Sequence, residues 1–269
     1  RDVMRRHGKP FTLLKIDDVS NIGSLKLRVR SLIESLKYKS IRGESQPFVT
    51  TKVFRKEDRK RKILAPFFTD FLSPLLPALL HLAGYDVEIL PPSDSVSAQK
   101  GLQYANNEVC YPATLIVGDM VKALQSGKYD PDKIALVMTQ TGGQCRATNY
   151  TALIKRAMIA NGFEKVPLIT LGVTTNGEEN EQDGFEFPWL KLASITTNTL
   201  LFSDVIAKLF YASVVRENEP GSAHKLKEKY LGLASKCILA NDAPGLMKLA
   251  GQAACEFDGI IHDEDCPKV

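Results

Sequence analysis

Residues 134–171 have the sequence IALVMTQTGGQCRATNYTALIKRAMIANGFEKVPLITL, and the pattern in this stretch decides the fold. Ile134–Met138 is a continuous apolar run, of the kind found in strands that are buried on both faces. Ala147–Ala160 carries apolar residues at helical spacing, and Val166–Leu171 is again apolar. A strand, a helix and a second strand in this order predict a βαβ unit with parallel strands.

The same alternation extends upstream of residue 134. The expected elements are a strand at Ile63–Ala65, a helix from Thr69 or Asp70 to Ala83, a strand at Val87–Leu90 and a helix from Pro112 to Ala123. Downstream, the pattern predicts helices at Thr197–Val215, Ala223–Leu239 and Pro244–Phe257. We therefore predict an α/β fold, with a Rossmann-like parallel sheet flanked by helices and an additional C-terminal helical segment.

The composition is typical of a globular protein, with 44% hydrophobic and 25% charged residues. The net charge of +4 comes from 35 basic and 31 acidic residues, which is too small an excess to indicate nucleic-acid binding. We interpret the densest basic run, residues 55–62, as a solvated approach to the first strand, with phosphate binding as the second interpretation. No stretch reaches the roughly 18 apolar residues of a membrane span, so we expect no membrane partner.

Two of the five cysteines stand where chemistry is expected. The uneven spacing of the five does not fit a secreted disulfide framework, so we expect a cytoplasmic protein. Cys145 follows the strand at Ile134–Met138 and precedes a helix, and Cys110 lies at the start of another helix. In an open α/β sheet, ligands bind beyond the carboxyl ends of the strands, where such loops lead into helices.

These positions favour a metal ligand. A helix N-terminus favours the thiolate, which is the form of cysteine that binds iron or zinc. Gly142 and Gly143, just before Cys145, lack Cβ atoms and would let backbone N–H groups approach a cluster sulfur. Together with Arg146, they are the candidate cofactor-binding residues. The pattern identifies no catalytic residue.

Other interpretations of the same residues stay open at this point. Cys110 and Cys145 are 35 residues apart (145 − 110) and lack the CxxC spacing of many metal sites. A cysteine without further context is more often a buried small hydrophobic residue. The Gly-Gly turn can also hold a phosphate, although it lacks the GxGxxG and Walker arrangements.

Several short stretches between Ile63 and Leu171 match a known family when they are taken together. They are Ala65-Pro66, Gly84-Tyr85, NEVCYP at 107–112, SGKYD at 126–130, and GGQCR at 142–146 with Asn149-Tyr150. With these stretches the chain resembles the dehydratase-like domain of the large CoA-substrate-specific enzyme activases, relatives of 2-hydroxyglutaryl-CoA dehydratase. In that family three cysteines from Rossmann-like domains hold a [4Fe–4S] cluster, and the resemblance implies that Cys110 and Cys145 are the first two.

The resemblance also implies a function and partners. The chain would be an iron–sulfur redox component of a CoA-substrate-specific enzyme activase or a 2-hydroxyacyl-CoA dehydratase-like protein. An ATP-dependent activase module, or another low-potential electron donor, would supply electrons, and acyl-CoA is a further possible partner. Two alternatives stay open: a non-catalytic interaction domain of an activase, and an acyl-CoA-binding Rossmann-like module. Whether the chain is itself an enzyme is left undecided.

The family pattern indicates that the chain is an internal fragment. We expect the tail of a preceding α/β unit at 1–45, with a strand at Pro10–Ile16 and a helix at Ser24–Leu36. A linker at 46–62 is expected to lead to the Rossmann-like cluster-binding domain at 63–190. A helical segment at 191–262 and a tail at 263–269, which leads to a further domain, complete the expected organisation. The third family ligand comes from that further domain. We therefore expect the cluster in the full-length protein and not in this chain, and we expect the sulfurs of Cys110 and Cys145 to converge.

Overall fold

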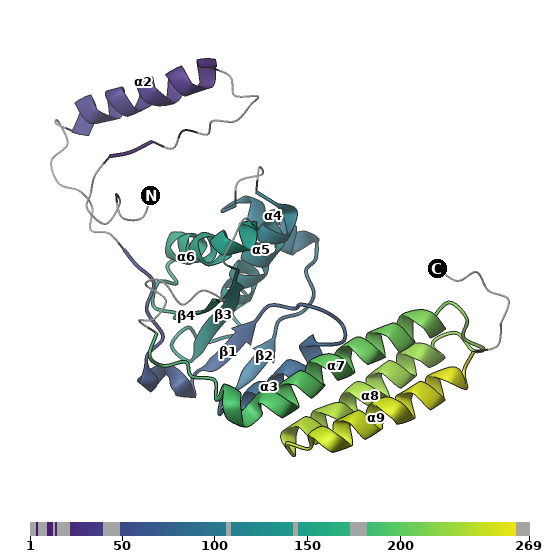
Figure 1. Ribbon diagram of the computed structural model, residues 1–269. Coiled ribbons are helices and arrows are strands. Elements are labelled where there is room, and N and C mark those ends of the chain that lie inside the picture. Colours follow the sequence, from purple (N-terminus) through teal and green to yellow (C-terminus); the bar gives the residue numbers. More distant parts are fainter. Residues whose placement is uncertain are drawn as a thin grey trace. The chain divides into compact units, whose positions relative to one another are not determined.

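A computed structural model describes residues 4, 10–12, 14, 22–39, 49–105, 109–141, 145–172 and 182–261 (Figure 1). Contacts divide the chain into two units, Arg1–Thr50 and Thr51–Val269. In the first unit, α2 (Ile22–Lys39) includes the helix expected at Ser24–Leu36. The strand expected at Pro10–Ile16 is not formed by the residues of that range that the structure describes.

The second unit is built around a four-stranded, all-parallel sheet, which confirms the predicted fold class. Its strands are β1 (Lys62–Ala65), β2 (Val87–Ile89), β3 (Ile134–Gln140) and β4 (Leu168–Gly172), in the order β2-β1-β3-β4. Ile63 of β1 pairs with Val87 of β2 on one side and with Ala135 of β3 on the other. The chain therefore leaves β1 in one direction and returns to its opposite side, which creates a switch point between β1 and β3.

Strand β3 is buried on both faces, as its continuous apolar sequence predicts. Leu136 and Met138 belong to one hydrophobic cluster, while Ala135 and Val137 belong to another on the opposite face of the sheet. The alternation follows from the two-residue period of a strand. Each face must therefore be covered by helices.

The helices around the sheet are α3 (Leu76–Leu82), which follows a 3-10 turn at Ser73–Leu75, then α4 (Ser95–Leu102), α5 (Tyr111–Gln125) and α6 (Tyr150–Ala160). Helices α5 and α6 pack on the Leu136 face, and Leu80 of α3 packs on the Ala135 face. This distribution is what right-handed crossovers produce when the strand order reverses at β1.

Residues 51–61, which the sequence analysis assigned to a linker, are packed against the sheet. Phe54 is fully buried in the cluster that contains Ala135. The backbone N–H of Lys52 donates to the carbonyl of Glu164 at 2.7 Å. The apolar side chain of Phe54 supplies the burial that holds this polar segment in place.

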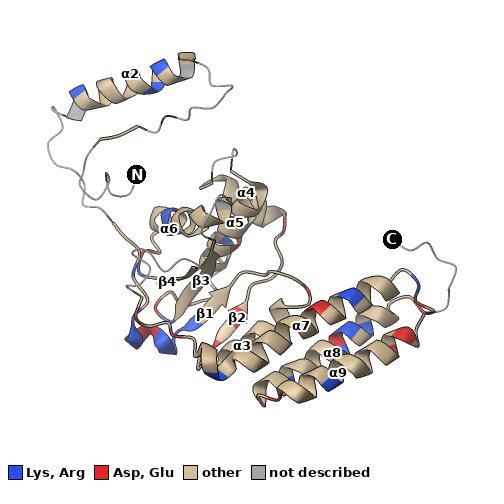
Figure 2. Cartoon of the chain, in the orientation of Figure 1, with Lys and Arg blue, Asp and Glu red and all other residues tan. Residues whose placement is uncertain are grey.

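The basic run at 55–62 is engaged in ion pairs, and Figure 2 shows acidic residues (red) among the basic ones (blue) there. Asp58 is buried and pairs with Lys52 and Arg61, each at 2.6 Å. Burial raises the pKa of Asp58, but hydrogen bonds from Lys52, the Arg55 backbone and Arg61 outweigh burial, so the pKa is lowered overall. These pairs favour the interpretation of the run as an approach to β1 over phosphate binding.

The C-terminal segment contains the helices α7 (Trp189–Ser213), α8 (Ser222–Leu239) and α9 (Ala243–Asp258) (Figure 1). Phe202, Tyr230 and Phe257, one from each helix, are fully buried in one cluster that also contains Leu75 next to α3. The predicted helical segment is therefore present and is joined to the sheet domain through α3. None of the described helices is long and apolar enough to cross a membrane.

Helices α4 and α5 approach each other closely because each presents a glycine at the contact. A Cβ atom on Gly118 of α5 would lie 1.7 Å from the carbonyl oxygen of Ser97, and one on Gly101 of α4 would lie 1.9 Å from that of Thr114. No side chain other than that of glycine fits these positions without moving backbone. Since α5 begins directly after Cys110, the contact also fixes the position of that residue.

We predict that Gly118→Ala destabilises the protein by roughly 1–3 kcal/mol, because the added methyl group forces α4 and α5 apart. Chemical denaturation followed by circular dichroism measures this change. Gly232→Ala in α8 is the matched control, since a Cβ there meets no atom within 4 Å. Alanine is the better helix former, so the control is expected to stabilise the protein by up to about 1 kcal/mol. Equal effects of the two changes would contradict the proposed close contact.

Candidate functional site

Cys110 stands at the N-cap of α5, with an extended backbone (ψ 140°) and Pro112 in the first helical turn. Its carbonyl oxygen accepts hydrogen bonds from the backbone N–H groups of Ala113 and Thr114 at 3.0 and 3.4 Å. Its thiol does not cap the helix. Instead it is half-buried against the α5–α6 cluster, and its Sγ lies 3.6 Å from the Oη of Tyr150.

Cys145 lies beyond the carboxyl end of β3, at the N-cap of the 3-10 turn Arg146–Asn149 that leads into α6. Its Sγ accepts a hydrogen bond from the backbone N–H of Ala147 at 3.5 Å. The residue is exposed. The sulfur therefore sits at the start of a helical segment and is open to a ligand from outside.

The end of β3 is tied to this turn by side-chain hydrogen bonds. Gln140, the last residue of β3, donates from its Nε2 to the carbonyl of Thr148 at 2.8 Å. The hydroxyl of Thr151 donates to the Oε1 of Gln140 at 3.3 Å. The thiol of Cys145 is thus placed by a strand end and a turn that are held together locally.

Tyr150 is the first residue of α6, and its hydroxyl contacts the thiol of Cys110. Its side chain is 7% exposed, and its pKa is raised to about 12. Burial is the main cause, followed by the hydrogen bond with Cys110 and by the negative charge of Cys110 and Cys145 in their ionised forms. Cys110 therefore contacts the Tyr150 phenol directly, whereas Cys145 caps the turn that leads into Tyr150.

The remaining residues of the candidate site lie partly outside the described structure. Gly142 and Gly143 are outside the described residues, and Arg146 is described only in its backbone. Among the described residues there is no group of three or more histidine, cysteine or acidic side chains that could hold a metal ion. Cysteine thiolates are the usual ligands of iron–sulfur clusters, and the side chains of Cys110 and Cys145 have the chemistry that such a ligand needs.

Two other cysteines are described, and both lie on the C-terminal helices. Cys237 on α8 is half-buried in the helical cluster, where burial and then the nearby Asp242 raise its pKa. Cys255 on α9 is exposed. Neither is within a group of metal-ligating side chains in the described part of the chain.

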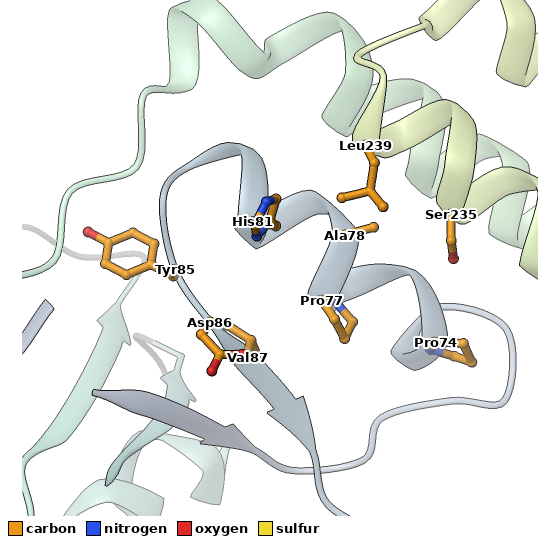
Figure 3. A pocket seen from close by; sticks show the side chains of 9 residues that line it. All are labelled: Pro74, Pro77, Ala78, His81, Tyr85, Asp86, Val87, Ser235 and Leu239. Atoms are coloured by element: carbon orange, nitrogen blue, oxygen red, sulfur yellow. The ribbon is translucent and has the colours of Figure 1, made fainter. Parts of the chain in front are cut away.

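A pocket of about 430 Å³ lies away from the cysteines, between α3 and α8 (Figure 3). It is lined by Pro74, Pro77, Ala78, His81, Tyr85, Asp86, Val87, Ser235 and Leu239. Asp86 and Val87 stand at the amino end of β2, whereas Cys145 follows the carboxyl end of β3. Because all strands are parallel, the pocket lies at the amino ends of the strands and the cysteine loops lie at their carboxyl ends.

No protein-family model matches the chain, and no curated protein or solved structure matches it either. The resemblance to the CoA-substrate-specific enzyme activases therefore stays a prediction from the sequence motifs.

Sequence reasoning did not single out Tyr150 as a functional residue. It counted Tyr150 only within the family-like Asn149-Tyr150 pair. The detectable signal is that Tyr150 shares the buried face of α6 with Ile154, Ala157 and Met158, at helical spacing. That spacing predicts a buried ring, but it does not predict which group the hydroxyl meets.

We predict that the free energy of unfolding falls less at alkaline pH in the Tyr150→Phe variant than in the wild-type protein. The folded state holds the pKa of Tyr150 at about 12, above the value of about 10 for an unfolded chain. The stabilisation linked to the protonated phenol is therefore fully present below pH 10 and is lost as the pH rises toward 12. Urea unfolding at several pH values between 9 and 12 measures the slope, which should be smaller for the variant.

Tyr111→Phe provides the control, because Tyr111 is next to Cys110 in sequence but 62% exposed. It should leave the slope at its wild-type value. The same alkaline slope in Tyr150→Phe and in the wild-type protein would contradict a buried, proton-holding Tyr150.

Proposed function

We propose that the second unit is part of an iron–sulfur protein related to the CoA-substrate-specific enzyme activases and 2-hydroxyacyl-CoA dehydratases. In this proposal Cys110 and Cys145 bind one [4Fe–4S] cluster. The observation that carries the proposal is that Cys110, at the start of α5, contacts Tyr150 at the start of α6, and that Cys145 caps the turn that leads into Tyr150. Ligand sites of open α/β sheets occur beyond the carboxyl ends of the strands, where these loops lie.

The chemistry of the two side chains fits a cluster. Iron–sulfur clusters are held by cysteine thiolates, and a helix N-terminus offers positive potential that suits a negatively charged group. The exposed position of Cys145 leaves room for ligands from another domain, as the family pattern requires. The half-buried position of Cys110 would shield one side of the group from water.

Within this proposal the residues of the chain have distinct roles. A bound [4Fe–4S] cluster supplies one-electron transfer at low potential. Cys110 and Cys145 would hold it. The hydroxyl of Tyr150 would hydrogen-bond to the Cys110 sulfur, and a hydrogen bond to a ligand of this kind tunes the reduction potential of a cluster. Gly142, Gly143 and Arg146 are proposed to line the same site. An ATP-dependent activase module or another low-potential donor would supply electrons, with acyl-CoA as a further partner, in the cytoplasm.

We predict that anaerobic reconstitution incorporates iron and sulfide into the full-length protein. Cys110→Ser and Cys145→Ser should each abolish this incorporation. Cys145→Ser should change the free energy of unfolding by less than about 0.5 kcal/mol, because its side chain is exposed. Iron and sulfide assays and the melting temperature are measured on the same samples. The isolated 269-residue chain, handled in air, should hold no intact cluster.

Cys255→Ser is the matched control, since Cys255 is also exposed but lies on α9. It should load iron like the wild-type protein. A Cys145→Ser protein with normal iron content would contradict the proposal. A rise in melting temperature with acyl-CoA that survives both cysteine replacements, without iron loading, would instead favour an acyl-CoA-binding module.

A further inference from the structure

Helix α7 has one face that its own domain leaves uncovered. Its buried face packs against α8 and α9 through side chains such as Leu192, Phe202 and Phe210. The opposite face is exposed although it is mostly apolar: Leu190 is 98% exposed, Leu201 51% and Tyr211 62%. A contiguous exposed apolar face is a feature of interaction surfaces rather than of ordinary solvent-exposed helices.

This face, which we call the α7 face, consists of Leu190, Ala193, Thr197, Leu200, Leu201, Asp204, Lys208 and Tyr211. Successive members are three or four residues apart, apart from the adjacent central leucines, so they form one stripe along the helix. The 25-residue helix carries only three charged side chains, Lys191, Asp204 and Lys208. Figure 2 shows α7 uncharged over most of its length.

The positions that make up the α7 face are spaced symmetrically about its centre, although both of its charged residues lie in the second half. Leu200 and Leu201 lie at the middle of the helix, which spans residues 189–213. Leu190 lies ten residues before Leu200, and Tyr211 lies ten residues after Leu201. In an antiparallel pair of these helices centred on Leu200 and Leu201, Leu190 of one helix therefore lies opposite Tyr211 of the other.

The two charged residues of the face, Asp204 and Lys208, do not meet each other's copies in the reversed register. In the reversed register, Asp204 meets Thr197 of the other helix, and Lys208 meets Ala193. A threonine hydroxyl can donate to the carboxylate of Asp204, and the Lys208 stem can cover alanine. Within each helix Asp204 and Lys208 already form an ion pair at 3.1 Å. Like charges therefore do not face each other across the pair.

We propose that the α7 face binds the α7 face of a second copy of this chain, with the two helices antiparallel about a twofold axis at Leu200 and Leu201. A twofold interface requires a surface that is complementary to itself. In the reversed register apolar side chains meet at the axis and at both ends, and no like charges face each other, which meets that requirement. The proposal is independent of the cluster site, because none of its residues lies in the cysteine loops.

The expected dimer is weak. A helix of 25 residues is about 37 Å long, so one helix pair gives an interface at the small end of the range for specific complexes. We therefore expect a dissociation constant on the order of 10 µM. Such a dimer forms and dissociates reversibly with protein concentration.

Sedimentation velocity over a range of concentrations tests the proposal, with circular dichroism to confirm folding. The wild-type chain should show a monomer–dimer equilibrium. The double variant Leu200→Lys, Leu201→Lys places four lysines at the twofold axis and should raise the dissociation constant by on the order of 100-fold or more. Leu102→Lys on α4 is the control, because Leu102 is 54% exposed but lies outside the α7 face, and it should leave the equilibrium unchanged.

Disulfide cross-linking tests the orientation. Leu190→Cys protein mixed with Tyr211→Cys protein should form a covalent dimer under mild oxidation. Leu190→Cys protein alone should stay at the wild-type background, since antiparallel packing separates the two copies of residue 190 by roughly 30 Å. A wild-type chain that stays monomeric at all concentrations, a dimer insensitive to the lysine variant, or efficient linking by Leu190→Cys alone would overturn the proposal.

Discussion

The burial of β3 on both faces is the constraint on which the second unit depends. Its backbone is paired on both sides, with β1 and with β4, and its side chains enter two separate hydrophobic clusters. A strand of this kind requires helices on both faces of the sheet, and parallel neighbours require crossover connections. The reversal of strand order at β1 sends α3 to one face and α5 and α6 to the other.

This arrangement explains why the candidate site is where it is. Parallel strands bring the following loops to a single edge, and helices that start there direct their N-termini toward it. Cys110 is positioned at the start of α5, and the position of α5 depends on the glycine contact with α4. Cys145 arrives through the end of β3, held by Gln140. Tyr150, at the start of α6, then meets Cys110, which is 40 residues away in the chain.

The two surfaces proposed for function use different parts of the unit. The cysteine loops lie at the carboxyl edge of the sheet, whereas the α7 face belongs to the helical segment. That segment is not an independent appendage, since its core includes Leu75 and Leu79 from the sheet domain. A partner bound at the α7 face would therefore contact an element that shares a core with α3.

Within the second unit, the sequence alone determined the order of elements, the parallel sheet, the helical segment and the placement of both cysteines in loops before helices. These features are local: apolar periodicity and helix-ending residues report on the chain within a few turns. The packing of residues 51–61, the earlier start of α7 at Trp189 and the contact between Tyr150 and Cys110 were decided only by the tertiary structure. Phe54, Leu192 and the Tyr150 hydroxyl each find their partners far along the chain, and no local pattern specifies which distant residue a buried group will meet.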